Sequence, residues 1–262
     1  MLFFNTYKFN ISICAIIKDE NEYLKEWLDY HIKIGVSHFF IYDNESSVPI
    51  GETVGAYLKK GLITLIDFPG KQKQVEAYHH CLKNFKKKSK WIAFIDTDEF
   101  IVPKSTNGDL NKFLKDFEKH GGLGVNWLLF GSSGLIDKPQ KSQLESFILR
   151  SREDFGVNEH IKTIVHTKYV KDVGPNPHCF LYVEGKHCVN ENFERIETAF
   201  AKNSTHKIQL NHYYCRSLEE YKEKISRGRA DDNSQRKLDD FYAHDRDSNI
   251  IEDRNILKII NS

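Results

Sequence analysis

Apolar and polar positions follow a regular strand–helix rhythm along the N-terminal part of the chain. Short apolar runs that predict β-strands alternate with stretches in which apolar residues recur every three or four positions, the spacing of an amphipathic helix. The strands are expected at 11–17, 37–42, 62–66 and 91–95. Such alternation indicates βαβ units, whose strands lie side by side in a mostly parallel sheet. The chain is therefore predicted to be an α/β protein.

Three helices are expected between these strands. The first has apolar side chains along one face from Leu24 to Ile32, and it ends at Gly35, a residue type common after helix C-termini. The other two are expected at 53–60 and 72–85. These helices are expected to cover the sheet.

Beyond Pro103 the rhythm loosens. A helix is expected at 110–120 and strands at 123–130 and 208–214, but 138–203 shows no steady period apart from short strands. Long irregular segments inside a compact enzyme usually form functional loops or lids. Loops that bind a ligand are therefore expected in this part of the chain.

A helix start and a change of composition mark the C-terminal part. Ser217, followed three residues later by Glu220, has the pattern of a capping box. Further on the sequence is highly charged, with a last helix expected at 250–260. We therefore predict a main domain, 1–229, and a charged helical extension, 230–262.

The apolar strand at 91–95 ends in a group of carboxylates. Asp96 and Asp98 stand two residues apart, with Glu99 beside them. In an open α/β sheet, ligands bind beyond the carboxyl ends of the strands. Carboxylate oxygens are hard ligands for a divalent cation, which can in turn hold phosphates. The pattern predicts a metal and nucleotide-diphosphate site, and the alternative is an acidic turn.

Polar residues also follow the first two predicted strands. Lys18, Asp19 and Glu20 come after the first strand, and Asp43 and Asn44 come after the second. Because the carboxyl ends of parallel strands meet at one edge of the sheet, these clusters should converge with the acidic one, which favours the site over the turn. Asp19 and Glu20 have a second interpretation, as caps of the following helix.

Composition and charge narrow the class of protein. Lysine and arginine number 38 against 37 for aspartate and glutamate, a net charge of +1, so no bulk field attracts nucleic acid. The 5 cysteines are widely spaced without a C-x-x-C pair, which predicts neither a zinc site nor a disulfide framework and indicates a reducing compartment.

No targeting or membrane-spanning segment is predicted. Apolar runs fall short of the roughly 18 residues that a transmembrane helix needs, and the N-terminal apolar stretch is too short for a signal peptide. We expect a cytoplasmic protein. A lysine cluster at 86–90 is explained by a solvated helix end, and it leaves open a peripheral position at the cytoplasmic face of the inner membrane.

Several separated segments together resemble a known family. The segments 16–35, 41–46, 91–100, 127–134 and 211–220 are similar, in this order, to motifs of glycosyltransferase family 92 and related family-2-like enzymes. The resemblance extends over most of the chain and does not depend on one Asp-x-Asp pair. It implies a GT-A fold and transfer of a sugar from a nucleotide sugar with inversion, usually with manganese (or magnesium) as the metal.

The resemblance also implies roles for individual residues. Asp98 is expected to coordinate the metal directly, Asp96 to lie nearer the donor ribose or the metal's water shell, and Asp43 to contact the nucleotide base. His212 matches the C-terminal histidine that often completes the metal shell in such enzymes, and imidazole suits manganese-like metals. The alternatives are a structural role for His212 and a metal-binding role for His178.

Two further roles follow from the chemistry of sugar transfer. Lys162 is a candidate for neutralising the donor phosphates, although lysines are common on exposed strands. An inverting transfer also needs a general base to deprotonate the acceptor hydroxyl. Glu145 matches a Glu-Arg-Phe motif of similar proteins, but Ser146 replaces the arginine, and Asp137 and Asp154 remain open alternatives.

The expected function is a metal-dependent, inverting glycosyltransferase. The donor is expected to be a UDP-sugar, with galactose as the first sugar to consider by family analogy. The acceptor is expected to be a glycan or glycolipid, such as lipopolysaccharide or capsule. Trp127 and Phe130 are expected either to stack against a sugar or to lie in the core.

Two other classes of protein share parts of this pattern. Phosphatases that form an aspartyl-phosphate prefer a small residue two positions after the second Asp, where this chain has Phe100. They also carry a later Asp-Asp pair after a strand, whereas Asp231 and Asp232 lie in a charged stretch without strand character. A non-catalytic carbohydrate-binding or scaffold protein with the same fold is the main alternative.

Overall fold

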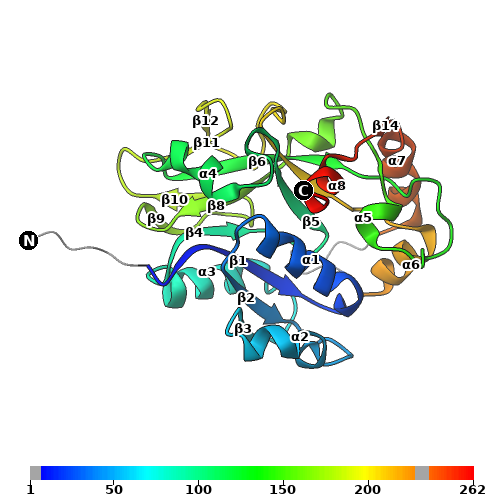
Figure 1. The fold of residues 1–262 in the computed structure, drawn as a ribbon, viewed down its shortest axis with the longest axis horizontal. Coiled ribbons are helices and arrows are strands. Elements are labelled where there is room, and N and C mark those ends of the chain that lie inside the picture. The colour runs from blue at the N-terminus through cyan, green and yellow to red at the C-terminus, as the bar shows by residue number, and fades with distance from the viewer. Residues whose placement is uncertain (1–6, 228–235) are drawn as a thin grey trace, which may run out of the picture.

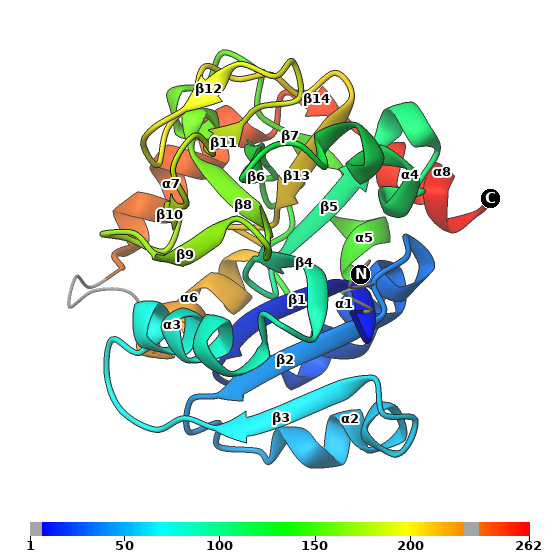
Figure 2. The same cartoon turned by 90° about the vertical axis from the view of Figure 1, so that its left-hand side faces the viewer.

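The computed structural model describes residues 7–227 and 236–262. Its N-terminal part is a parallel sheet in the order β3-β2-β1-β4, which Figure 2 shows from the bottom upward. Helices connect the successive strands. These elements are β1 (Phe9–Ile17), α1 (Asn21–Lys33), β2 (His38–Asp43), α2 (Ile50–Lys59), β3 (Ile63–Asp67), α3 (Gln74–Phe85) and β4 (Ser89–Phe94).

Successive residues of β1 face opposite layers of the core, because side chains alternate along a strand. Ile13 lies in one core cluster with Leu24 of α1 and Val54 of α2, whereas Cys14 lies in another with Tyr78 of α3. Helices α1 and α2 therefore cover one face of the sheet, and α3 covers the other. Burial on both faces explains why apolar residues fill this strand from Ile11 to Ile17 apart from the buried Ser12.

The rest of the sheet is mixed. β8 runs antiparallel to both β4 and β6, β6 is parallel to β11 and β13, and β13 is antiparallel to β5. β9 and β10 form a separate ribbon. The strands are β5 (Glu99–Pro103), β6 (Gly122–Leu129), β8 (Ile161–His166), β9 (Val170–Val173), β10 (Phe180–Tyr182), β11 (Cys188–Val189), β12 (Arg195–Ile196) and β13 (Ile208–His212).

The predicted α/β class with a mostly parallel sheet is confirmed. Beyond the first four strands, the structure differs from the predictions in several places. The helix expected at 110–120 ends early as α4 (Leu110–Leu114), because a tighter 3-10 turn then brings Phe117 against Phe113 in the core. Strand β5 was not expected, since its partner β13 lies far along the chain and leaves no local signal.

The first C-terminal helix begins where the sequence indicated. α6 (Leu218–Arg227) follows the predicted capping box, in which Ser217 and Glu220 exchange hydrogen bonds. The prediction of a single helix at 250–260 was wrong, because this stretch begins with strand β14 (Ile251–Glu252), which pairs with β7 (Leu149–Arg150). The elements are β7 (Leu149–Arg150), α7 (Leu238–Ser248), β14 (Ile251–Glu252) and α8 (Asn255–Ile260), with α6 and α7 on the right of Figure 1.

The last helix is part of the main core. Ile256 and Ile259 of α8 are buried in the same cluster as α1. The boundary predicted between 229 and 230 lies outside the described residues. Within 7–227 and 236–262, no helix is long and apolar enough to cross a membrane.

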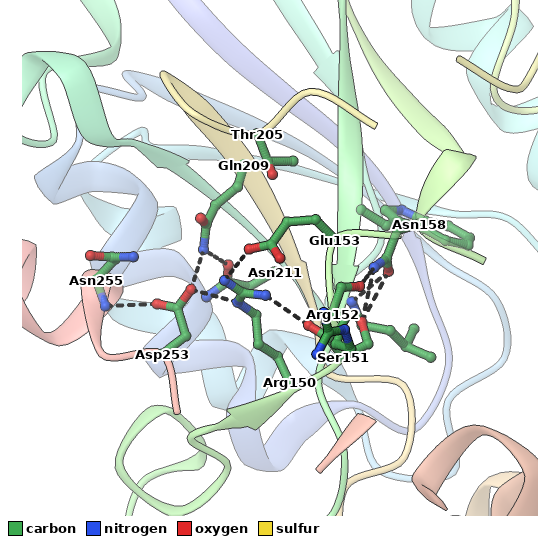
Figure 3. Close-up of polar contacts among 12 residues, drawn as sticks. Arg150, Ser151, Arg152, Glu153, Asn158, Thr205, Gln209, Asn211, Asp253 and Asn255 are labelled. Atoms are coloured by element: carbon green, nitrogen blue, oxygen red, sulfur yellow. Dashed lines mark hydrogen bonds and ion pairs between the residues drawn. The ribbon is translucent and has the colours of Figure 1, made fainter. Parts of the chain in front are cut away.

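A buried polar network joins this C-terminal segment to β7 and β13 (Figure 3). The guanidinium of Arg150 donates to the Asp253 carboxylate (2.9 Å). That carboxylate also accepts from the side chain of Gln209 (3.2 Å) and the backbone N–H of Asn255 (2.9 Å). One carboxylate thus holds three segments together.

Candidate functional site

The loops that follow β1 and β2 are joined by hydrogen bonds. The Asp19 carboxylate, next to the half-buried Lys18, accepts from the backbone N–H of Ser47 (2.6 Å). The backbone N–H of Asp19 donates to the Ser46 hydroxyl (3.1 Å), and the Asp43 carboxylate accepts from the Ser46 N–H (3.0 Å). The structure therefore brings together the two polar clusters that the sequence placed at this edge.

Asn44 and Glu20 anchor the same edge to more distant segments. The Asn44 amide donates to the carbonyl groups of Phe68 and Gly70 (both 2.8 Å), which ties the end of β2 to the loop after β3. Glu20 accepts from the guanidinium of Arg216 (3.1 Å), which follows β13. Both contacts hold the loops that surround the acidic strand end.

Asp96 lies where three elements meet. Its carboxylate accepts from the side chains of Gln74 (2.7 Å) in α3 and Lys162 (2.8 Å) in β8. Lys162 is 2% exposed and also lies 3.8 Å from Glu99. Burial would lower the pKa of Lys162, but these two carboxylates raise it well above its usual value. In this structure Lys162, predicted to contact phosphate, is charged and neutralises Asp96.

The turn that carries both aspartates is fixed by Glu99. The Glu99 carboxylate accepts a hydrogen bond from the backbone N–H of Asp96 (2.9 Å). The backbone carbonyl of Glu99 accepts one from the indole N–H of Trp27 (2.8 Å). Burial, together with the charges of Asp96 and Asp98, outweighs Lys162 and raises the pKa of Glu99 well above its usual value. Glu99 thus supports the turn that carries Asp96 and Asp98.

Asp98 is buried between a lysine and a histidine. Its Oδ2 accepts from the ammonium of Lys224 in α6 (2.6 Å), and its Oδ1 lies 3.6 Å from Nε2 of His212 at the end of β13. Burial would raise the pKa of Asp98, but Lys224, His212 and Arg216 hold it well below its usual value. Burial lowers the pKa of His212. At neutral pH, Asp98 is therefore an anion and His212 a neutral imidazole.

Asp98 and His212 fit a shared divalent cation. Two ligand atoms that each lie about 2.1 Å from one small cation are roughly 3 to 4 Å apart, and the separation of Asp98 Oδ1 and His212 Nε2 is 3.6 Å. Nδ1 of His212 is buried and has no hydrogen-bond partner among the described residues, so no bond within this part of the chain gives that nitrogen a structural role.

The protein supplies only part of a metal shell. Among the described residues, no group of three or more His, Cys, Asp or Glu side chains is placed to hold a metal ion. A cation at Asp98 and His212 would therefore take its remaining ligands from phosphate oxygens and water. Cations that act on nucleotides are often bound in this way, through one or two carboxylates and the substrate's phosphates.

Trp127 lies beside His212 in a cluster of rings. Its ring centre is 4.4 Å from that of His212 and 5.7 Å from that of His178. Nδ1 of His178 contacts the carbonyl oxygen of Ile161 (2.7 Å), so this histidine has a structural partner. Trp127 is half-buried and can contact a ligand, whereas Phe130 is fully buried in the core.

A cavity of about 370 Å³ opens beside His178. Its volume lies in the range of small-molecule pockets, and its walls come from β8, β10, β11 and β12. All its lining residues fall in the irregular segment in which ligand-binding loops were expected. They include Ile161, Thr163, Tyr182, Arg195, Glu197 and Thr198.

Sequence reasoning missed two cations of the site, Lys224 and Arg216. Arg216 is 7% exposed, and its Nε donates a hydrogen bond to the side chain of Gln143 in α5 (Gln143–Ser146; 2.8 Å). Its ion-pair partner Glu20 lies 196 residues earlier in the chain. No local pattern links such distant residues. One signal was available for Lys224: it follows the buried Tyr221 by three positions, on the same face of α6.

The three candidate bases are all exposed. Asp154 forms a surface ion pair with Arg152 (3.5 Å), and Asp137 lies in the loop before α5. Glu145 lies within α5, the short helix that also contacts the buried Arg216. Glu145 and Asp137 therefore both lie on segments that contact the site, since the carbonyl groups of Leu135 and Ile136 accept from the first residues of α6.

Comparisons with known proteins agree with the resemblance. Residues 7–249 match the sequence model of glycosyltransferase family 92. A family 92 protein of Oryza sativa subsp. japonica is 27% identical over 221 residues, which are 83% of this chain and 35% of that protein. A galactan β-1,4-galactosyltransferase of Arabidopsis thaliana is 28% identical over 109 residues, which are 37% of this chain and 21% of that protein. The chain thus spans about a third of the rice relative's length.

Among solved structures, residues 1–349 of S. aureus TarS in complex with UDP are similar with a TM-score of 0.42 and 15% identity, covering 60% of this chain and 47% of that one. The α/β sheet described above is the GT-A-like architecture that the resemblance implied. Since the family match extends over nearly all of the chain, the chain belongs to glycosyltransferase family 92.

Proposed function

We propose that this chain catalyses the metal-dependent, inverting transfer of a sugar from a nucleotide-diphosphate donor to a glycan or glycolipid. Family membership supports glycosyl transfer as the reaction class. The names of two Arabidopsis relatives, galactan galactosyltransferases, favour galactose as the sugar, and UDP is proposed as the nucleotide by analogy. The relatives reported above are plant proteins, so the acceptor is not narrowed to lipopolysaccharide or capsule.

The observation that carries the proposal is the Asp98–His212 pair at the carboxyl edge of the sheet. A sugar diphosphate concentrates negative charge on its leaving group, and a divalent cation held by this pair would neutralise part of that charge. Gln74 and Lys162 fix the Asp96 carboxylate beside it, where it can accept a hydrogen bond from a donor hydroxyl. Groups that are fixed before the reaction need no rearrangement during it.

The proposed acceptor site is the cavity beside His178. Its lining includes Arg195 and Thr198, which can bond sugar hydroxyls, and Tyr182, which offers an aromatic surface. His178 connects the cavity to Trp127, whose ring contacts His212. Two successive ring contacts therefore link the cavity to the proposed metal pair.

Glu145→Gln is expected to preserve UDP binding and to lower the transfer rate by about 10²- to 10⁴-fold, because an amide cannot take the acceptor's proton. Steady-state kinetics give the rate, and calorimetry gives UDP affinity. Asp154→Asn and Asp137→Asn are the matched controls, since both also neutralise exposed carboxylates. If Glu145→Gln keeps a near-normal transfer rate and one control loses most of it, the aspartate changed in that control is the general base.

Calorimetric titration with a panel of nucleoside diphosphates, each with and without manganese, tests the proposed function. We expect metal-dependent binding of UDP, together with slow metal-dependent hydrolysis of a UDP-sugar when no acceptor is present. If none of the nucleotides binds, the proposed transferase function is contradicted, and a non-catalytic carbohydrate-binding or scaffold protein is favoured.

A further inference from the structure

Lys224 occupies the carboxylate that is proposed to bind metal. Its ammonium lies 2.6 Å from Oδ2 of Asp98, and the two side chains are only 10% and 11% exposed. The same ammonium donates to the carbonyl oxygen of Tyr214 (3.2 Å) and lies 4.8 Å from the centre of that ring. Lys224 is thus the cation that neutralises Asp98 in the protein without donor.

A second cation on Asp98 would meet this ammonium at close range. The oxygen that faces His212 and the oxygen that binds Lys224 belong to one carboxylate with a single negative charge. Two cations a few ångströms apart repel strongly when little solvent lies between them. A divalent ion can therefore bind Asp98 tightly only if the ammonium moves away or if further negative charge arrives.

A nucleotide diphosphate supplies both conditions. Its oxygens add negative charge beside Asp98 and offer the ammonium another anion to bind. Lysine carries its charge on a flexible four-carbon stem, so the ammonium of Lys224 can change partners without a movement of the backbone. Among residues 7–227 and 236–262, its other polar and ring contacts are with the carbonyl oxygen and the ring of Tyr214.

We propose that Lys224 is an internal counter-ion that keeps divalent metal off Asp98 until a nucleotide diphosphate binds. This inference rests on the function proposed above. The Lys224–Asp98 pair weakens metal binding in the donor-free protein, and the diphosphate removes this competition. Metal and nucleotide then bind with positive coupling, each raising the affinity for the other by the same factor.

Lys224→Met tests the inference through metal binding, without an activity assay. Methionine keeps an unbranched apolar side chain and removes the charge. We expect the Mn²⁺ affinity of the nucleotide-free protein, measured by electron paramagnetic resonance, to rise at least about tenfold, and the coupling between Mn²⁺ and UDP to fall by the same factor. Lys222→Met, which removes an exposed lysine of the same helix, should change neither quantity.

The possible outcomes separate this inference from the proposed function. Equal Mn²⁺ affinity in the wild type and Lys224→Met, or tight Mn²⁺ binding to the wild type without UDP, would overturn the counter-ion role and leave the metal site standing. Absence of Mn²⁺ binding to both proteins, with or without UDP, would overturn the metal site itself and the counter-ion role with it.

Two further measurements keep the test valid if the variant folds poorly. Lys224→Met leaves the Asp98 charge buried without its partner, so its Tm should fall in chelator and should rise with Mn²⁺ by more than that of the wild type. In the wild type, the side-chain ¹⁵N signal of Lys224 should shift when Mg²⁺ and UDP are added together. A shift with the same concentration of Mg²⁺ alone, or no shift with both, would contradict the inference.

Discussion

Asp98→Asn is expected to abolish manganese-dependent binding of UDP and to lower transfer by about 10²- to 10⁴-fold. An amide carries no charge and is a weak metal ligand, so the cation would retain only His212 from the proposed pair. Metal stabilisation of a transferring group contributes several kcal/mol, and each 1.36 kcal/mol corresponds to about tenfold in rate. Calorimetry with UDP in manganese and steady-state kinetics measure the two effects.

The same substitution removes the anionic partner of Lys224, so a loss of stability must be separated from a loss of function. The double variant Asp98→Asn with Lys224→Met removes both charges and should regain stability without regaining metal binding, because a buried pair can often be replaced by neutral groups at little cost. Asp116→Asn neutralises an exposed carboxylate in the 3-10 turn after α4 and should behave as wild type. Unchanged UDP affinity in Asp98→Asn would exclude Asp98 as a metal ligand.

The N-terminal half of the fold was predictable because its signals are local. Strand β1 is buried on both faces, and its residues 11–17 therefore appear in the sequence as a run that is apolar at every position except Ser12. Helix α1 buries one face, and its apolar residues recur at helical spacing. Once these strands are parallel, the position of Asp19, Asp43 and Asp96 at one edge follows from topology alone.

The second half depends on pairings that leave no local pattern. Strand β5 is a short apolar segment whose partner, β13, lies more than a hundred residues further along the chain. Strands β11 and β12 have two residues each, too few for any period to be visible. These elements form because distant segments pack together, and a single sequence does not show which segments meet.

In the candidate site, too, some residues could be predicted from the sequence and others could not. The carboxylates and His212 were identified because their types and their positions after strands are visible in the sequence. Their partners could not be identified in the sequence. Lys224 lies 126 residues from Asp98, and a lysine in a helix is usually exposed to solvent. The charge balance of the site, which decides how a metal can enter it, is therefore a property of the fold.

The segment 250–260 was misjudged for a related reason. Its apolar residues fit a helix, but the pairing of β14 with β7 and the buried Arg150–Asp253 contact are tertiary features (Figure 3). Asp253 appears in the sequence as one more charge in a charged tail. In the structure its side chain is 2% exposed.

Asp253→Ala is expected to lower the free energy of unfolding by about 3 kcal/mol, the low end for breaking a buried ion pair, because Arg150 loses its buried carboxylate and keeps the exposed Glu153 as a partner. Burial would raise the pKa of Asp253, but hydrogen bonds from Asn255, Arg150 and Gln209 lower it. A carboxyl with a lowered pKa stabilises the protein above its unfolded pKa, so this contribution is present at neutral pH and is lost as the pH falls below about 4. Urea unfolding at pH 7 measures the loss.

The neighbouring carboxylate gives a matched control for this measurement. Glu252 precedes Asp253 and pairs with Arg254 on the surface, so Glu252→Ala should cost less than about 1 kcal/mol. In the double variant Arg150→Met with Asp253→Ala, the total loss should be smaller than the sum of the single losses, because neither charge is left buried alone. Similar small losses for Asp253→Ala and Glu252→Ala would show that the polar network does not hold the C-terminal segment to β7 and β13.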